Sequence, residues 1–181
     1  MVGLLGVVFN KCEEFRPDEK SRGTVKYYSI VDAAQSARDL SMMCNLGGAV
    51  GAVPKLKQQE EYSTVFAPRN GAFSSIPRSV LNEMWMPGNK LWSGIFWHHV
   101  TEGSYGPERL KDGQVLRQLD GGVVKISKKD GIFAVDGVPI RDVQIVGNGV
   151  IYRIDSLLLT KAAQTEIQHV QISRRNNATT R

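Results

Sequence analysis

Five Asp-Gly or Asn-Gly pairs divide the second half of the chain, and they constrain its fold more than any other feature of the sequence. The pairs begin at Asp112, Asp120, Asp130, Asp136 and Asn148. Such pairs favour positive φ, so they close tight turns between antiparallel strands. The runs between them are short and β-branched, as in 123–126 (VVKI), 132–135 (IFAV) and 143–146 (VQIV). We therefore predict a strand-rich region after about residue 113.

The first half of the chain predicts helices instead. Residues 29–43 (SIVDAAQSARDLSMM) are rich in helix formers, their apolar residues share one face, and Ser29 can cap the N-terminus. After Gly47-Gly48, residues 49–59 (AVGAVPKLKQQ) predict another short helix, broken or entered at Pro54. Helices followed by strands predict an α+β fold rather than an alternating α/β fold.

Length and charge favour one soluble domain with tails. The chain has 181 residues, of which 41% are hydrophobic and 23% charged. We place the domain at 25–160, between an N-terminal extension (1–24) and a basic C-terminal tail (161–181) that carries 4 basic residues and 1 acidic residue. Arg174 and Arg175 in this tail are candidate partner contacts. No helix-turn-helix, zinc-finger or aromatic RNA-binding motif accompanies the charge, so we expect no specific nucleic-acid binding.

The first nine residues are apolar but are too short to span a bilayer, and they lack the basic segment and cleavage site of a signal peptide. Unless a targeting segment has been removed, this favours an intracellular or organellar location, such as a chloroplast, over an extracellular one. We expect Cys12 and Cys44 to be free or buried thiols, because they form neither a disulfide framework nor a C-x-x-C motif.

Three segments in order identify a family. Residues 62–73 (YSTVFAPRNGAF) predict a strand that enters a polar turn and a short helix, 97–105 (WHHVTEGSY) precede a glycine turn, and 148–159 (NGVIYRIDSLLL) predict a closing strand. Together they resemble the motifs of the fasciclin domain family, which includes β-Ig-h3-type domains. The resemblance covers 25–160 and implies a twisted antiparallel β-sandwich or wedge flanked by several short helices.

Four polar residues of these motifs are predicted to serve the core. Thr64 lies in the first strand, Asn70 can cap the helix that starts at Gly71, and His99 matches the histidine of the family's Tyr-His segment. Asp155 lies among aliphatic residues, so we expect it to be buried and hydrogen-bonded, with Thr64 or Asn70 as possible donors.

No catalytic or metal site is predicted. The chain has three histidines without the spacing of zinc ligands, and no G-x-S-x-G segment supplies an activated serine. Residues 47–52 (GGAVGA) lack the middle glycine and the preceding strand of a dinucleotide-binding turn. We therefore expect neither an enzyme nor a cofactor.

All three tryptophans lie between residues 84 and 97, and this stretch is the predicted contact patch. Part of the stretch is expected to be core, but its large residues, Trp85, Trp92 and Trp97 among them, do not easily all fit inward, and exposed tryptophan or methionine commonly marks a partner or ligand surface. His98 replaces the tyrosine of the family's Tyr-His segment, which is associated with integrin binding. A packed histidine is favoured over a receptor contact there.

The resemblance implies a protein that binds other proteins, and three roles stay open. The favoured role is a scaffold or linker subunit, since fasciclin domains occur among phycobilisome linkers of red algae, where acidic pigment proteins attract a basic chain. The second is adhesion at the cell surface or in the extracellular matrix, supported by the sequon at Asn177. The third is carriage of a small apolar ligand such as a carotenoid.

Overall fold

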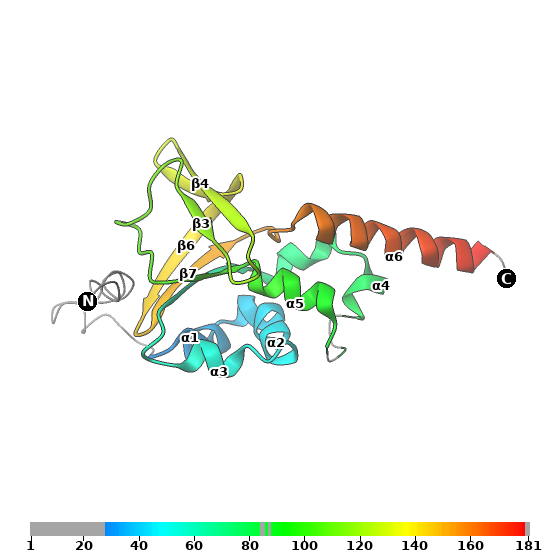
Figure 1. Cartoon of the computed structure of the whole chain (residues 1–181), viewed down its shortest axis with the longest axis horizontal. Coiled ribbons are helices and arrows are strands. Elements are labelled where there is room, and N and C mark those ends of the chain that lie inside the picture. Colours follow the sequence, from blue (N-terminus) through cyan, green and yellow to red (C-terminus); the bar gives the residue numbers. More distant parts are fainter. Residues whose placement is uncertain (1–27, 84–85, 87, 180–181) are drawn as a thin grey trace, which may run out of the picture.

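The computed structural model describes residues 28–83, 86 and 88–179, with side chains to residue 172 (Figure 1). The helical elements are α1 (Ile30–Ser36), η2 (Arg38–Leu40), α2 (Ser41–Ala49), α3 (Val53–Lys57), η3 (Asn70–Ser75), α4 (Arg78–Leu81), α5 (Lys90–Trp97) and α6 (Lys161–Thr179). The strands are β1 (Ser63–Pro68), β2 (Val100–Glu102), β3 (Val115–Arg117), β4 (Val123–Lys129), β5 (Ile132–Val135), β6 (Val138–Val146) and β7 (Gly149–Ile154). The predicted extension 1–24, with Cys12, lies outside the described residues.

One curled sheet holds the seven described strands in the order β2-β1-β7-β6-β5-β4-β3. The consecutive strands β3 to β7 pair antiparallel, as the Asp-Gly turns predict. β1 pairs parallel with β7, which differs from the all-antiparallel expectation. A bridge between Thr101 and Gln118 joins the two ends of the sheet, so the strands wrap nearly into a barrel. A parallel pair needs a long connection, and the whole of the chain between β1 and β7 supplies it.

The neighbouring strands β1 and β7 are buried on both faces and separate two cores. Val65 of β1 and Ile151 of β7 face the helices, in a core formed with α1, α2 and α5. Phe66 and Tyr152 point the other way into the curl of the sheet, where their rings stack with centroids 5.6 Å apart. This two-sided burial explains why the motif strands lack the polar alternation of a surface strand.

The predicted helix 29–43 is interrupted. Ser29 does cap α1, since its Oγ accepts a hydrogen bond from the Asp32 N–H at 3.1 Å, but Ala37 is extended and ends the helix. The side chain of Asn70 holds the junction to α2: Oδ1 accepts from the Met42 N–H, and Nδ2 donates to the Arg38 carbonyl. The expectation that Asn70 caps its own helix is therefore corrected, because η3 begins at Asn70 without a side-chain cap.

The β4–β5 and β5–β6 turns need left-handed backbone. Asp130 and Asp136 have φ values of 51° and 46°, and the glycines that follow them are also positive. Two consecutive positive φ angles suit the twist of a two-residue hairpin.

The segment 161–181 is more than the tail expected from its charge. Residues 161–179 form α6, and its Ala163 and Ile167 are buried against the helix-side core. In Figure 1, the red end of this helix extends away from the sheet. None of the described helices is both long and apolar enough to cross a membrane.

Candidate functional site

His99 is a fully buried link between α5 and the segment that follows β7. Its Nδ1 lies 2.7 Å from the Ile95 carbonyl oxygen and its Nε2 lies 2.9 Å from the Leu158 backbone nitrogen. Because Leu158 N–H can only donate, Nε2 must accept and the proton must sit on Nδ1. Burial lowers the pKa of His99 to about 4, so the ring is neutral at physiological pH.

His98 points inward as well, beside Asp120. Its Nδ1 lies 2.8 Å from Asp120 Oδ2, and the two side chains are 6% and 16% exposed. Gly122 passes so close that an added Cβ would lie 2.8 Å from the imidazole ring. This site does not extend to a metal centre, because in the described part of the chain no three His, Cys, Asp or Glu side chains gather in a metal-binding group. His98 is therefore an interior side chain in this structure.

Thr64 joins β1 to the loop after β2. Its Oγ1 donates to the Gly103 carbonyl oxygen at 2.8 Å and accepts from the Tyr105 N–H at 2.9 Å. Asn148, which the sequence had indicated as a turn residue, is fully buried. Its side chain accepts from the Ile30 N–H and donates to the carbonyls of Leu56 and Gln58, so it ties α1 and the end of α3 to the β6–β7 turn.

Asp155 lies at the surface, which corrects its predicted burial. β7 ends at Ile154, and the aspartate leaves the sheet to form ion pairs with Arg141 at 2.6 Å and Arg69 at 3.6 Å. The neighbouring Arg153 is the more buried charge, with 12% exposure, and it pairs with Asp39 and Asp142. The aliphatic run around Asp155 did not reveal this because its members face two different cores.

Trp92, the middle residue of the predicted aromatic patch, does not lie at the surface. Trp92 is fully buried and its Nε1–H donates to the Val80 carbonyl oxygen at 3.2 Å, so it is a core side chain. Trp97 is half-buried and packs edge-to-face on Phe96. Trp85 lies outside the described residues. Arg174 and Arg175 belong to α6, and their side chains also lie outside the description.

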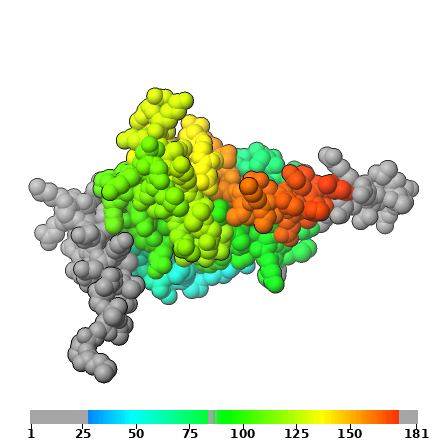
Figure 2. All heavy atoms as spheres, turned by 45° about the horizontal axis from the view of Figure 1, so that its top comes forward, coloured from blue at the N-terminus to red at the C-terminus, as the bar shows by residue number. Residues whose placement is uncertain are grey.

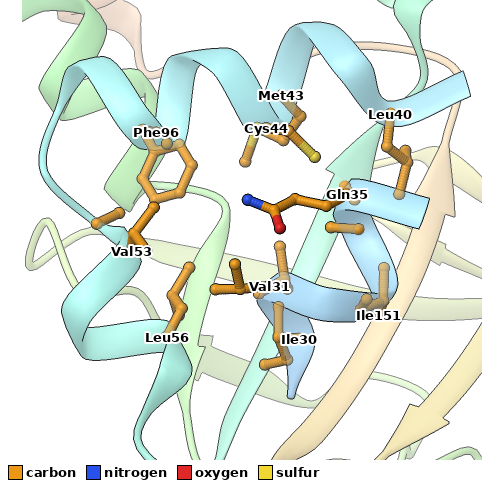
Figure 3. A pocket seen from close by; sticks show the side chains of 15 residues that line it. Ile30, Val31, Gln35, Leu40, Met43, Cys44, Val53, Leu56, Phe96 and Ile151 are labelled. Atoms are coloured by element: carbon orange, nitrogen blue, oxygen red, sulfur yellow. The ribbon is translucent and has the colours of Figure 1, made fainter. Parts of the chain in front are cut away.

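An apolar pocket lies between the helices and the sheet (Figure 3). Side chains from α1, α2, α3 and α5, among them Val31, Cys44, Leu56 and Phe96, surround it. Its volume is about 50 Å³, whereas pockets for drug-sized ligands measure roughly 300–1,000 Å³. Burial raises the pKa of the Cys44 thiol, which favours its protonated form. The pocket as it stands has room for a small apolar group and not for a carotenoid.

A solvent-facing surface of β3, β4 and β5 was missed by the sequence reasoning. Val115, Val123 and Ile132 are exposed by 58%, 54% and 56%, and Arg117, Lys125 and Lys129 are exposed among them. We call these six residues the basic-aliphatic face. The alternating pattern of 115–117 and 123–126, with Leu116, Val124 and Ile126 turned inward, could have predicted it. In Figure 2, which brings the top of Figure 1 forward, yellow-green atoms of the part of the chain that contains these strands lie on the side facing the viewer.

The comparisons with known proteins agree with the geometry. The family model described as "Fasciclin domain" matches residues 38–160. Human periostin is 27% identical over 144 residues, which are 77% of this chain and 17% of periostin. Protein sll1483 of Synechocystis is 29% identical and aligns over 72% of this chain and 73% of its own length. Rabbit transforming growth factor-beta-induced protein ig-h3 is 34% identical over 72% of this chain and 17% of that protein.

A solved FAS1 domain pair from the insect cell adhesion molecule fasciclin I superposes with a TM-score of 0.66 at 16% identity, over 76% of this chain and 52% of that chain. The likeness shows a shared fold. This chain corresponds to about a sixth of periostin and of ig-h3 and to most of sll1483.

Proposed function

The chain belongs to the fasciclin domain family, and on that premise we propose that it is a non-catalytic module that binds another protein as a scaffold or linker subunit of a larger assembly. The observation that carries the proposal is how the interior polar groups are used. Thr64, His99 and Asn148 are each hydrogen-bonded to the backbone of the fold itself. His98 is bound to Asp120. These groups are thereby committed to holding elements together, and recognition is left to the outer surface.

The experiment is isolation of the native chain with its neighbours. Gentle affinity purification from the source cells, followed by chemical crosslinking and mass spectrometry, should yield a protein partner in a fixed ratio to the chain. The complex should weaken as salt is raised, because salt screens the attraction between exposed charges. The screening length is about 10 Å at 0.1 M salt and shortens as the salt concentration rises. A chain that migrates alone at both low and high salt would contradict the proposal. Acidic pigment proteins of a light-harvesting antenna are one possible partner set that this purification would identify.

A second candidate function is adhesion at a cell surface. It is favoured by the names of relatives, since the mycobacterial proteins MPB83 and MPT83 are described as cell surface glycolipoproteins and are 31% identical over 55% of this chain. The mass of the native protein tests it: a glycan on Asn177 would establish passage through a secretory route. Carriage of a carotenoid is less well supported, because the described apolar pocket holds about 50 Å³.

A further inference from the structure

The strands that carry the basic-aliphatic face contain charge of one sign only. The strands β3, β4 and β5 contain four basic residues, Arg117, Lys125, Lys128 and Lys129, and no Asp or Glu. Within the described residues none of these four cations forms an ion pair, although ion pairs engage Lys55, Arg69, Arg141 and Arg153 elsewhere. Lys128, which is not one of the six face residues, lies over the ring of Phe133. Carboxylates lie in the adjoining turns: Asp130 follows Lys129, and Asp136 and Asp112 accept hydrogen bonds from the backbone N–H groups of Lys125 and Lys128.

The strand register sets the cations among aliphatic side chains. Val115 lies opposite Lys125, and Arg117 lies opposite Val123, so each cross-strand pair combines one cation and one valine. On the adjoining hairpin Lys129 lies opposite Ile132 in the same way. Three exposed aliphatic groups therefore alternate with three cations over neighbouring strands.

We propose that the basic-aliphatic face is the docking surface for an acidic protein partner. The partner's carboxylates pair with the three cations, and its apolar side chains cover the three aliphatic groups. Interfaces between proteins combine an apolar centre with charge complementarity, and arginine is enriched there. The inference rests on the proposed function, and it adds the location of the surface and the chemistry of the partner.

The composition of the face disfavours the other polyanions. Single-stranded nucleic acids are held by aromatic side chains on which bases stack, and the face has none. Membrane-surface segments bury Trp, Phe or Leu among the lipid headgroups, whereas the valines here project a short distance from a pleated sheet. A protein surface that follows the sheet closely is the occupant that can reach both the valines and the cations.

The first test uses the full chain and a defined acidic probe. The probe is a fluorescein-labelled peptide of alternating Glu and Val, about ten residues long, and the control peptide has Lys in place of Glu. Fluorescence anisotropy at low salt should show binding of the acidic peptide alone. The variant R117E/K125E should bind it about tenfold or more weakly, since complementary charge raises association rates by 10–10³.

The matched control is K57E/K161E, which removes the same net charge from exposed positions on α3 and α6. It should retain most of the binding. The variant V115T/V123T keeps all charges and the β-branched shape, and it should weaken binding severalfold. It tests the same face without a change of charge, so the proposal can still be checked if R117E/K125E does not fold. Equal losses in R117E/K125E and K57E/K161E would overturn the proposal, since binding would then follow net charge and not this face.

The other occupants are tested in parallel. Binding of the wild-type chain to phosphatidylserine-containing vesicles or to a single-stranded oligonucleotide more tightly than to the acidic peptide would overturn the proposal, as would self-association that R117E/K125E abolishes. Different outcomes would refute the docking surface and the proposed module function. A native partner whose crosslinks avoid β3–β5 refutes the docking surface and leaves the module function standing, whereas absence of any native partner refutes the function.

Discussion

The neutral, buried state of His99 predicts how the protein loses stability in acid. The folded-state pKa is about 4, and the ordinary value is 6.5. Between these values the unfolded chain binds a proton that the folded chain does not, so stability falls as pH falls. The stability that depends on neutral His99 is fully present above about pH 6.5 and is lost as the pH falls toward 4. A shift of this size corresponds to about 3 kcal/mol of unfolding free energy, at about 1.4 kcal/mol per pH unit.

The physical reason is that protonation breaks a contact as well as burying a charge. An imidazolium would place an N–H on Nε2, which faces the Leu158 N–H at 2.9 Å. The variant H99Q removes the titration while retaining an amide N–H for the Ile95 carbonyl and an oxygen for Leu158. It is expected to lower stability at pH 7 by about 1–3 kcal/mol, because its hydrogen bonds are less well placed in a site shaped for a ring.

Urea unfolding followed by circular dichroism at intervals from pH 7.5 to pH 4 measures the effect. The wild type and the surface control H169Q should lose about 3 kcal/mol more than H99Q over this range, since the wild type differs from H99Q only at the buried histidine and H169Q in addition lacks only an exposed one. Parallel curves for the wild type and H99Q would show that His99 does not supply the pH dependence, and the reasoning from its burial would be wrong.

Two further predictions concern close packing around the β6–β7 turn. G149A should destabilise the protein by more than about 3 kcal/mol, because a Cβ would lie 1.9 Å from the Ser63 carbonyl oxygen. The control G48A changes an exposed helical position where an added Cβ has nothing within 4 Å, so it should be neutral or stabilising by up to about 1 kcal/mol. Thermal melting measures both effects. N148A should cost about 3 kcal/mol or more, because it removes the side-chain partner of the buried Ile30 N–H and Leu56 carbonyl and of the partly buried Gln58 carbonyl. Hydrogen exchange should show the Ile30 amide losing protection, and an unchanged Ile30 amide would refute the role.

The hairpins could be predicted because their determinants are local. An Asp-Gly pair and the alternation on either side of it lie within about ten residues, so the turns at Asp130 and Asp136 follow from sequence alone. The parallel pairing of β1 with β7 has no such local determinant. It was not predicted, because the family resemblance was taken to imply an antiparallel sandwich and the continuous apolar runs of the two motif strands show burial but not direction.

Polar residues near the core were harder to place, since burial depends on where a strand ends. Asp155 follows Ile154, the last residue of β7, and reaches solvent. Asn148 precedes Gly149, the first residue of β7, and is enclosed by the start of α1 and the end of α3. The side-chain hydrogen bonds of Asn148 span 90 to 118 residues of sequence, so a local Asn-Gly turn pattern could not reveal them. Residues 161–179 were assigned to a tail by charge, although Ala163 and Ile167 are spaced by one helical turn.

The candidate site follows from the same two-sided geometry. β1 and β7 use both faces for the two cores, so the sheet can present a broad solvent-facing surface where helices do not cover it, on β3 to β5. Side chains there are free of packing constraints, and an exposed position in a strand tolerates either a valine or a lysine at small cost. A run that places cations and aliphatic groups side by side with no carboxylate among them is therefore not required by the fold. That independence from folding is why substitutions at Arg117 and Lys125 can separate recognition from stability, which substitutions at His99 or Asn148 cannot do.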